Sequence, residues 1–208
     1  MMDANAKVLY QKVFILATGS AASKDALEIF DSLVTPQFGY GKIAEIVEAY
    51  MDGVVRSIGR VEAFRAMLKQ GFSVQLTQDA ASGLLDALDA AGLKTWSHLY
   101  VAALNLGAPY KSALDQKASL ANEIADRLES AGKTALYQGP AIYAATKTVL
   151  ESVSNGSASL ELARSNANSF VDALSAGGIR SAVVDGYIAG ATVLADGDGD
   201  GVLDPGEW

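Results

Sequence analysis

The side chains with the clearest capacity for chemistry are five carboxylates near the end of the 208-residue sequence, within Asp196–Glu207. This stretch fits the calcium-loop pattern D-x-D/N-x-D/N-G-x5-E at every specified position. In such loops positions 1, 3 and 5 supply carboxylates, position 7 supplies its backbone carbonyl, position 9 often acts through a water, and position 12 binds bidentately. The spacing therefore predicts a calcium site formed by Asp196, Asp198, Asp200, Val202, Asp204 and Glu207.

Calcium suits this set because a hard cation takes about six to eight oxygen ligands at flexible angles, and the loop offers no sulfur or imidazole. The alternative is an acidic, solvated tail, but such a tail has no reason to place Gly201 at the turn position and Glu207 at position 12. Upstream, Gly186–Ala195 is rich in β-branched residues and reads as a strand. We expect an EF-hand-like loop that leaves a strand, at the start of a following β module.

The charge distribution supports this placement. The chain has 16 basic and 24 acidic residues, a formal net charge of −8, and five of the acids lie in the loop, which has no basic residue. Residues 1–195 therefore carry 16 basic and 19 acidic residues, a charge of −3. No basic stripe is present to neutralise phosphates, which argues against a nucleic-acid partner. The absence of cysteine excludes disulfides, thiolate metal sites and a cysteine nucleophile.

The pattern upstream of the loop is that of packed helices. Half of the residues are hydrophobic (50%) and few are aromatic (8%). Apolar residues recur at helical spacing, and turn or capping residues separate the segments. We expect a mainly α fold: a multi-helix bundle of short amphipathic helices over 1–178, followed by a β-like segment with the calcium loop over 179–208. The predicted helices cover about 5–18, 24–34, 42–57, 61–70, 78–91, 96–106, 112–131, 140–150 and 159–176.

Three local features qualify this prediction. Gly59 is expected to mark a kink or break between two helices, and Gly71 is expected to cap the second of them. Residues 72–76 alternate briefly but are interpreted as an extended connector rather than a strand. The apolar run Val13–Ala22 is too short to span a membrane, and its helical spacing favours an amphipathic helix over a signal-peptide core.

Groups suited to catalysis are sparse. His98 is the sole histidine and has no obvious nucleophile or metal partner, so it is interpreted as structural or superficial. No nucleophile-elbow, zinc-protease, Walker or dinucleotide motif occurs. Two acidic pairs, Glu45 with Glu48 and Glu123 with Asp126, could bridge a metal in a bundle, but the Glu-x-x-His motifs of di-iron bundles are absent. A solvated helix face is the preferred interpretation, and we expect no enzymatic activity.

Several segments resemble the Ala-rich helical modules of large bacterial surface proteins, namely S-layer proteins and RTX-type adhesins exported by type I secretion. They are Ala17–Ala22, Leu76–Trp96, Leu120–Ala125 and Ser157–Leu160, and the junction Gly190–Glu207 resembles the opening of the calcium-bearing β modules of such proteins. The chain departs from RTX arrays in lacking Gly-Gly-x-Gly-x-Asp repeats.

The resemblance implies a secreted, non-enzymatic, calcium-dependent protein of the bacterial cell surface. Its helical part would contact lipopolysaccharide or another envelope glycan, or neighbouring copies of the chain. A non-catalytic accessory region of a secreted enzyme is the alternative. An intracellular calcium sensor is less favoured, because the second helix of an EF-hand and its paired loop are both missing.

Overall fold

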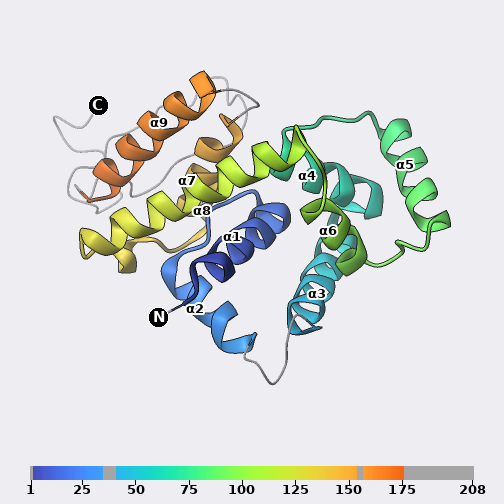
Figure 1. The fold of residues 1–208 in the computed structure, drawn as a ribbon, viewed down its shortest axis with the longest axis horizontal. Helices are drawn as coiled ribbons and strands as arrows, with labels where there is room; N and C mark the ends of the chain where they lie inside the picture. Colours follow the sequence, from blue (N-terminus) through green and yellow to red (C-terminus); the bar gives the residue numbers. More distant parts are fainter. Residues whose placement is uncertain (1, 35–40, 154–156, 176–208) are drawn as a thin grey trace, which may run out of the picture.

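The computed structural model describes residues 2–34, 41–153 and 157–175, and within them the chain forms nine α-helices and one 3-10 turn, η1 (Figure 1). In chain order the elements are α1 (Ala4–Thr18), α2 (Lys24–Leu33), α3 (Gly41–Ile58), α4 (Arg60–Phe72), α5 (Gln78–Ala90), α6 (Trp96–Leu104), α7 (Tyr110–Ser130), η1 (Thr134–Leu136), α8 (Pro140–Glu151) and α9 (Ser157–Ser175). The predicted mainly α fold is confirmed. The predicted β-like segment lies outside the described residues.

Short polar side chains begin several of these helices. Asp3, Ser23, Thr77 and Thr95 each accept a hydrogen bond from a backbone N–H in the first turn that follows, which satisfies a donor that the helix itself cannot pair. Glycine in the left-handed region ends α1, where Gly19 has a φ of 79°. These local signals explain why the predicted starts of α2, α5 and α6 agree with the structure.

Two long helices form the centre of the molecule. α1 lies along α7, and α4 packs against both (Figure 1). α9 and α8 pack on each other and cover one side of α7, while α3 and α6 form a pair on the other side of α1. α5 packs mainly on α4, and a bidentate ion pair fixes it there: both terminal nitrogens of Arg60 lie 2.6 Å from a carboxylate oxygen of Asp89.

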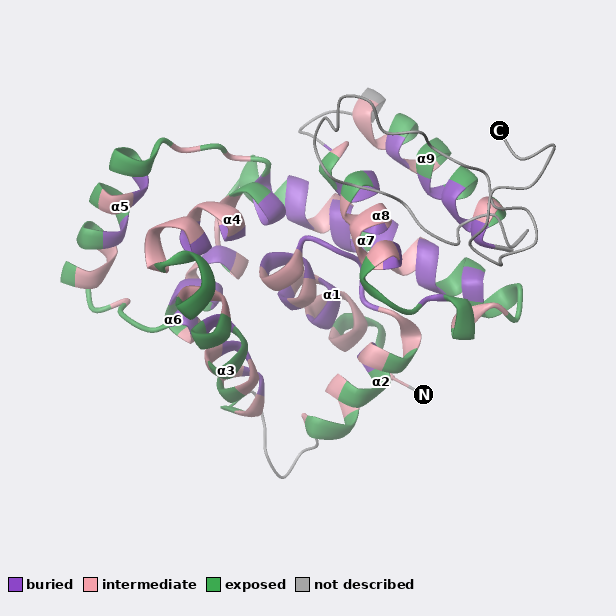
Figure 2. Ribbon diagram, turned by 180° about the vertical axis from the view of Figure 1, so that it is seen from behind, coloured by how far each residue is buried: buried purple, intermediate pink, exposed green. Residues whose placement is uncertain are grey.

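One face of α1 is buried in the core (Figure 2). Ile15 and Leu16 have no exposed surface, and the side-chain amide of Gln11 is equally buried. Gln11 Nε2 donates to the carbonyl of Ala22 at 3.1 Å, and Gln11 Oε1 accepts from the N–H of Ala22 at 2.8 Å. One side chain therefore satisfies both backbone groups of a buried residue in the α1–α2 connection.

The prediction that Gly71 caps α4 is wrong. The helix continues to Phe72, and its cap is Ser73, which has a φ of 57°. Gly71 is instead buried inside the last turn, where a Cβ atom would lie 2.5 Å from Leu16 Cδ2. A Cβ at this position would clash with the Leu16 side chain, so the glycine lets Leu16 pack directly against the last turn of α4. The connector prediction holds beyond the cap, since residues 74–77 form no regular structure.

Two further expectations need correction. α7 begins at Tyr110, earlier than the predicted start near Ser112 or Asp115. Tyrosines at helical spacing are expected in the core, yet Tyr50 and Tyr110 are 44% and 42% exposed. Among the described helices, none combines the length and hydropathy that a membrane crossing requires.

Candidate functional site

The six residues predicted to bind calcium, Asp196 to Glu207, lie outside the described residues, as does the predicted strand before them. Within residues 2–34, 41–153 and 157–175, no three His, Cys, Asp or Glu side chains are grouped so that they could hold a metal ion. The loop therefore stays a prediction from the sequence pattern alone.

The acidic pairs considered as metal bridges are engaged in other contacts. Glu123 Oε1 lies 2.9 Å from Arg164 Nη2, and Asp126 forms an ion pair with Lys7. These pairs join α7 to α9 and α7 to α1 respectively. Glu45 pairs with Lys42 one turn earlier in the same helix, at 2.6 Å. All three carboxylates are partly or largely exposed, which fits their interpretation as members of a solvated helix face.

Glu48 has a more specific role at the start of α6. Its Oε1 accepts a hydrogen bond of 2.6 Å from the backbone N–H of Ser97, so a side chain of α3 caps the N-terminus of α6. Burial raises the pKa of Glu48, but hydrogen bonds from Ser97, Trp96 and Thr95 outweigh it and leave the pKa below its usual value. The carboxylate is thus a stabilising contact between two helices, favoured by the helix dipole.

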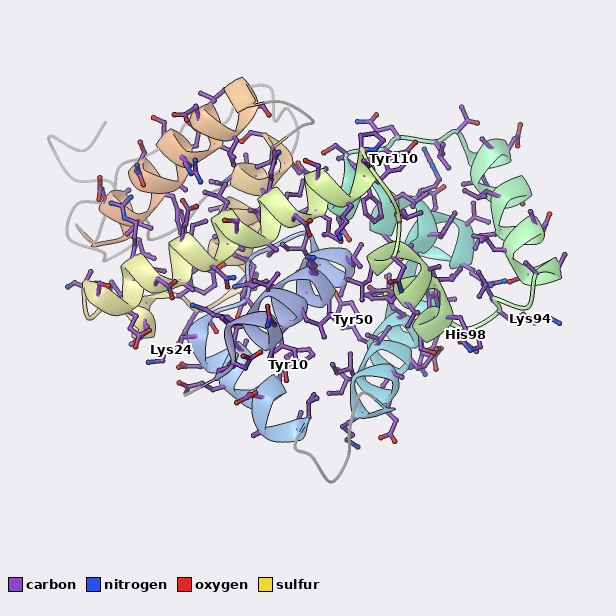
Figure 3. The ribbon with its side chains drawn as sticks, in the orientation of Figure 1. Tyr10, Lys24, Tyr50, Lys94, His98 and Tyr110 are labelled. Carbon is purple, nitrogen blue, oxygen red and sulfur yellow. The ribbon has the colours of Figure 1, made fainter. Side chains whose placement is uncertain are left out.

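His98 is exposed and lies at the outer side of α6 (Figure 3). Its backbone N–H donates to Thr95 Oγ1 at 3.3 Å as part of the helix cap. This position agrees with its interpretation as a structural or superficial residue.

A fully buried lysine lies where α7 meets the C-terminal end of α4. Lys117 Nζ donates to the backbone carbonyl of Gln70 at 2.7 Å and to Ser73 Oγ at 3.1 Å. Ser73 Oγ in turn donates to the carbonyl of Val153 at 3.1 Å, just beyond the end of α8. The ammonium group therefore lies near the negative ends of two helix dipoles.

The surroundings of Lys117 change its proton affinity. Burial lowers its pKa to about 8, while the charge of Glu151 raises it and that of Lys69 lowers it further. Because the side chain has no exposed surface, it acts as a clamp between helices rather than as a nucleophile. The sequence analysis missed it, although Lys117 stands three residues after Leu114 and three before Leu120, inside the apolar stripe of its helix.

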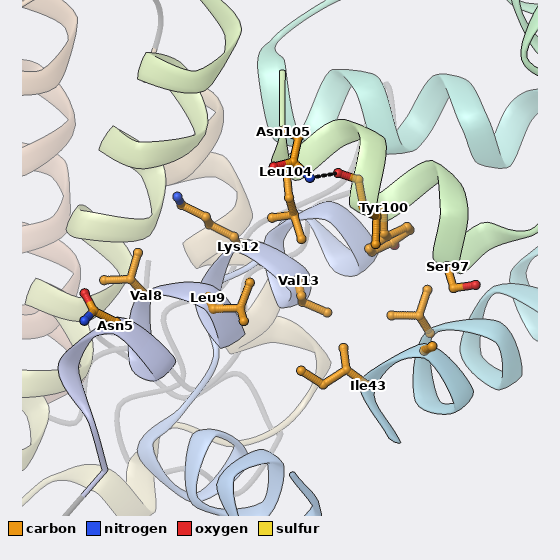
Figure 4. A pocket seen from close by; sticks show the side chains of 13 residues that line it. Asn5, Val8, Leu9, Lys12, Val13, Ile43, Ser97, Tyr100, Leu104 and Asn105 are labelled. Carbon is orange, nitrogen blue, oxygen red and sulfur yellow. Dashed lines mark hydrogen bonds between the residues drawn. The ribbon is translucent and has the colours of Figure 1, made fainter. Parts of the chain in front are cut away.

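The most ligand-like feature of the described residues is a groove between α1, α3 and α6, with a volume of about 520 Å³ (Figure 4). We call it the α1–α3–α6 groove. Its walls are mostly aliphatic, and they are formed by Val8, Leu9, Val13, Ile43, Ala44, Val47, Tyr100, Val101 and Leu104. Its polar lining residues are Asn5, Lys12, Ser97 and Asn105. The sequence analysis did not predict it, because its walls come from three separate segments.

Comparison of the chain with known families, with curated proteins and with solved structures found no match. The resemblance to S-layer and RTX-type surface proteins therefore rests on the sequence segments named above. The geometry of the described residues and the motif at 196–207 are the two sources for a functional proposal.

Proposed function

We propose that this chain is a non-enzymatic, calcium-binding module of a bacterial surface protein of the S-layer or adhesin class. The observation that carries the proposal is the loop Asp196–Glu207, which matches the calcium pattern at all specified positions. Five clustered carboxylates repel one another without a cation, so calcium binding orders the loop by neutralising them.

The helical region is proposed to serve as the scaffold beside this loop. Several of its acids are held in ion pairs between helices, as in Glu123 with Arg164 and Asp126 with Lys7, so those charges already have partners. In this proposal the helices contact lipopolysaccharide, another envelope glycan or a neighbouring copy, and calcium stiffens the connection to the following module.

The test is a calorimetric calcium titration of the metal-stripped chain, with magnesium as the competing ion. We expect one calcium-selective site. Asp198→Asn and Glu207→Gln should each weaken binding by about tenfold or more, because each removes a charged ligand. Asp172→Asn is the matched control: its carboxylate is 73% exposed and pairs with Arg127 in the helical region, so calcium affinity should not change.

Unchanged calcium affinity in both loop variants would overturn the calcium assignment. The surface role has its own test, in which the chain is sedimented with purified bacterial outer-membrane fragments, with calcium and with a chelator. Calcium-dependent sedimentation supports the proposal. Sedimentation that is the same with calcium and with chelator, and the same for the parent chain and the loop variants, contradicts it.

A further inference from the structure

We propose that the α1–α3–α6 groove binds a single aliphatic chain carried by a soluble, uncharged amphiphile. This inference is independent of the calcium loop and of the surface role proposed above. It starts from size: the groove volume of about 520 Å³ falls within the range of about 300–1,000 Å³ that is typical of small-molecule sites.

The walls determine the ligand class. Val8, Leu9 and Val13 follow one face of α1, and the aliphatic residues of α3 and α6 close the other two sides. Among the described residues that line the groove, Tyr100 is the only aromatic one, and it is almost fully buried, 2% exposed, with its hydroxyl 3.4 Å from the sulfur of Met51. A saccharide or a nucleobase would need exposed aromatic faces and several polar partners, whereas an aliphatic chain needs only the apolar surface that is present.

The charges point to an uncharged head group. Lys12 is the one charged residue among the described lining residues, and its ammonium is already paired with Asp115 of α7. The described walls therefore hold no uncompensated charge that would attract an anion or a cation. Asn5 and Ser97 lie at opposite ends of the groove (Figure 4), where an amide or a hydroxyl can hydrogen-bond a neutral polar head.

The position of the groove favours a soluble ligand over a bilayer. The groove is bounded by helices on three sides, so it can enclose one chain but presents no flat apolar face for insertion into a bilayer.

The experiment is a calorimetric titration of the full-length chain with monolauroylglycerol below its micelle concentration. We expect one site with a dissociation constant on the order of 10 micromolar, from the usual affinity per ligand atom. Binding should show a negative heat-capacity change, which reports burial of apolar surface.

Two matched variants test whether the ligand binds in the α1–α3–α6 groove. Val101→Asp puts a carboxylate in the groove wall at a position that is 57% exposed, so the fold tolerates it; binding should weaken about tenfold or more. Leu162→Asp makes the same kind of change at a 59% exposed position of α9, outside the groove lining, and binding should not change. Far-UV circular dichroism confirms that both variants fold.

Three results would overturn the proposal: no saturable binding, equal weakening by the two variants, or sedimentation with phosphatidylcholine vesicles in place of monomer binding. Analytical ultracentrifugation without ligand adds a fourth. If the parent chain is a dimer and Val101→Asp makes it a monomer, the groove is covered by a second copy and not by a lipid. Calcium affinity is measured in the same samples, so failure here is distinguishable from failure of the calcium assignment.

Discussion

The two faces of α1 differ in how completely the chain fills the space beside them. On the closed face, Leu16 packs directly against Gly71 of α4, and the amide of Gln11 satisfies the backbone of Ala22. On the open face, Val8 and Leu9 line the α1–α3–α6 groove and are only half-buried. One helix thus contributes both to a closely packed contact and to an apolar groove. Apolar residues at helical spacing therefore predict that a helix face is apolar, but they do not predict which element packs against it.

The largest effect on the closed face is expected from Gln11→Leu. The substitution replaces the side-chain amide with an apolar group of similar size and leaves the buried N–H and carbonyl of Ala22 without partners. Two unsatisfied backbone groups should lower the free energy of unfolding by about 2–5 kcal/mol. Urea denaturation followed by circular dichroism measures it.

Gln116→Leu is the matched control for this change. Gln116 lies in α7, is half-buried, and its Oε1 has no hydrogen-bond partner within the described part of the chain. Its Nε2 donates only to Ser112 Oγ, at 3.2 Å. We expect a change of less than about 1 kcal/mol. Equal destabilisation by the two leucine variants would show that the hydrogen bonds of Gln11 to Ala22 do not contribute more to the free energy of unfolding than those of a half-buried glutamine.

The second expected effect concerns the close approach of α1 and α4. Gly71→Ala places a Cβ 2.5 Å from Leu16 Cδ2, and Leu16 is fully buried, so relief of the clash requires a shift within the core. Overpacking of this kind should destabilise the fold by about 1–3 kcal/mol. Gly83→Ala, inside α5 with no atom within 4 Å of the new Cβ, should instead stabilise it by about 0.5–1 kcal/mol.

A double variant sharpens this comparison. If the clash with Leu16 causes the loss, Gly71→Ala combined with Leu16→Ala should be less destabilised than the sum of the two single changes, with a coupling of about 1 kcal/mol. Additive losses would mean that Gly71 is required for a reason other than its contact with the Leu16 side chain.

The helices were predictable because their signals are local. Ser23, Thr77 and Thr95 cap the starts, and Gly19 ends α1 in the left-handed conformation. The role of Gly71 was not predictable, since a glycine in an apolar run can equally end a helix or allow another helix to approach. The choice depends on Leu16, which lies far away in the sequence.

The two candidate sites differ in the same way. The proposed calcium loop could be assigned residue by residue because its six candidate ligands lie within twelve consecutive positions. The α1–α3–α6 groove could not, because Val13, Ile43 and Tyr100 belong to three helices whose relative placement no local pattern specifies. Lys117 was predictable in part. Its position in an apolar stripe indicates burial, but its partners Gln70 and Ser73 depend on the packing of α4 against α7.

The smallest effect at neutral pH is expected from Lys117→Met, next to the closed face. The change removes a buried charge, which is favourable, and removes the donor to Gln70 and Ser73, which is unfavourable. These two effects are of similar size, so the free energy of unfolding at pH 7 should change by less than about 2 kcal/mol.

The pH dependence separates the two contributions. Burial lowers the folded-state pKa of Lys117 to about 8 from its ordinary value of 10.5. Between these values the unfolded chain binds a proton that the folded chain has released, so stability rises as pH increases through this window and is flat with respect to this group below it. The rise amounts to about 3 kcal/mol. In Lys117→Met this rise should vanish, whereas Lys94→Met, on an exposed connector, should retain it. A parent chain with no such rise would show that the ammonium is fully compensated by the α4 carbonyl and Glu151, and that the tight packing of the closed face accommodates a charge without cost.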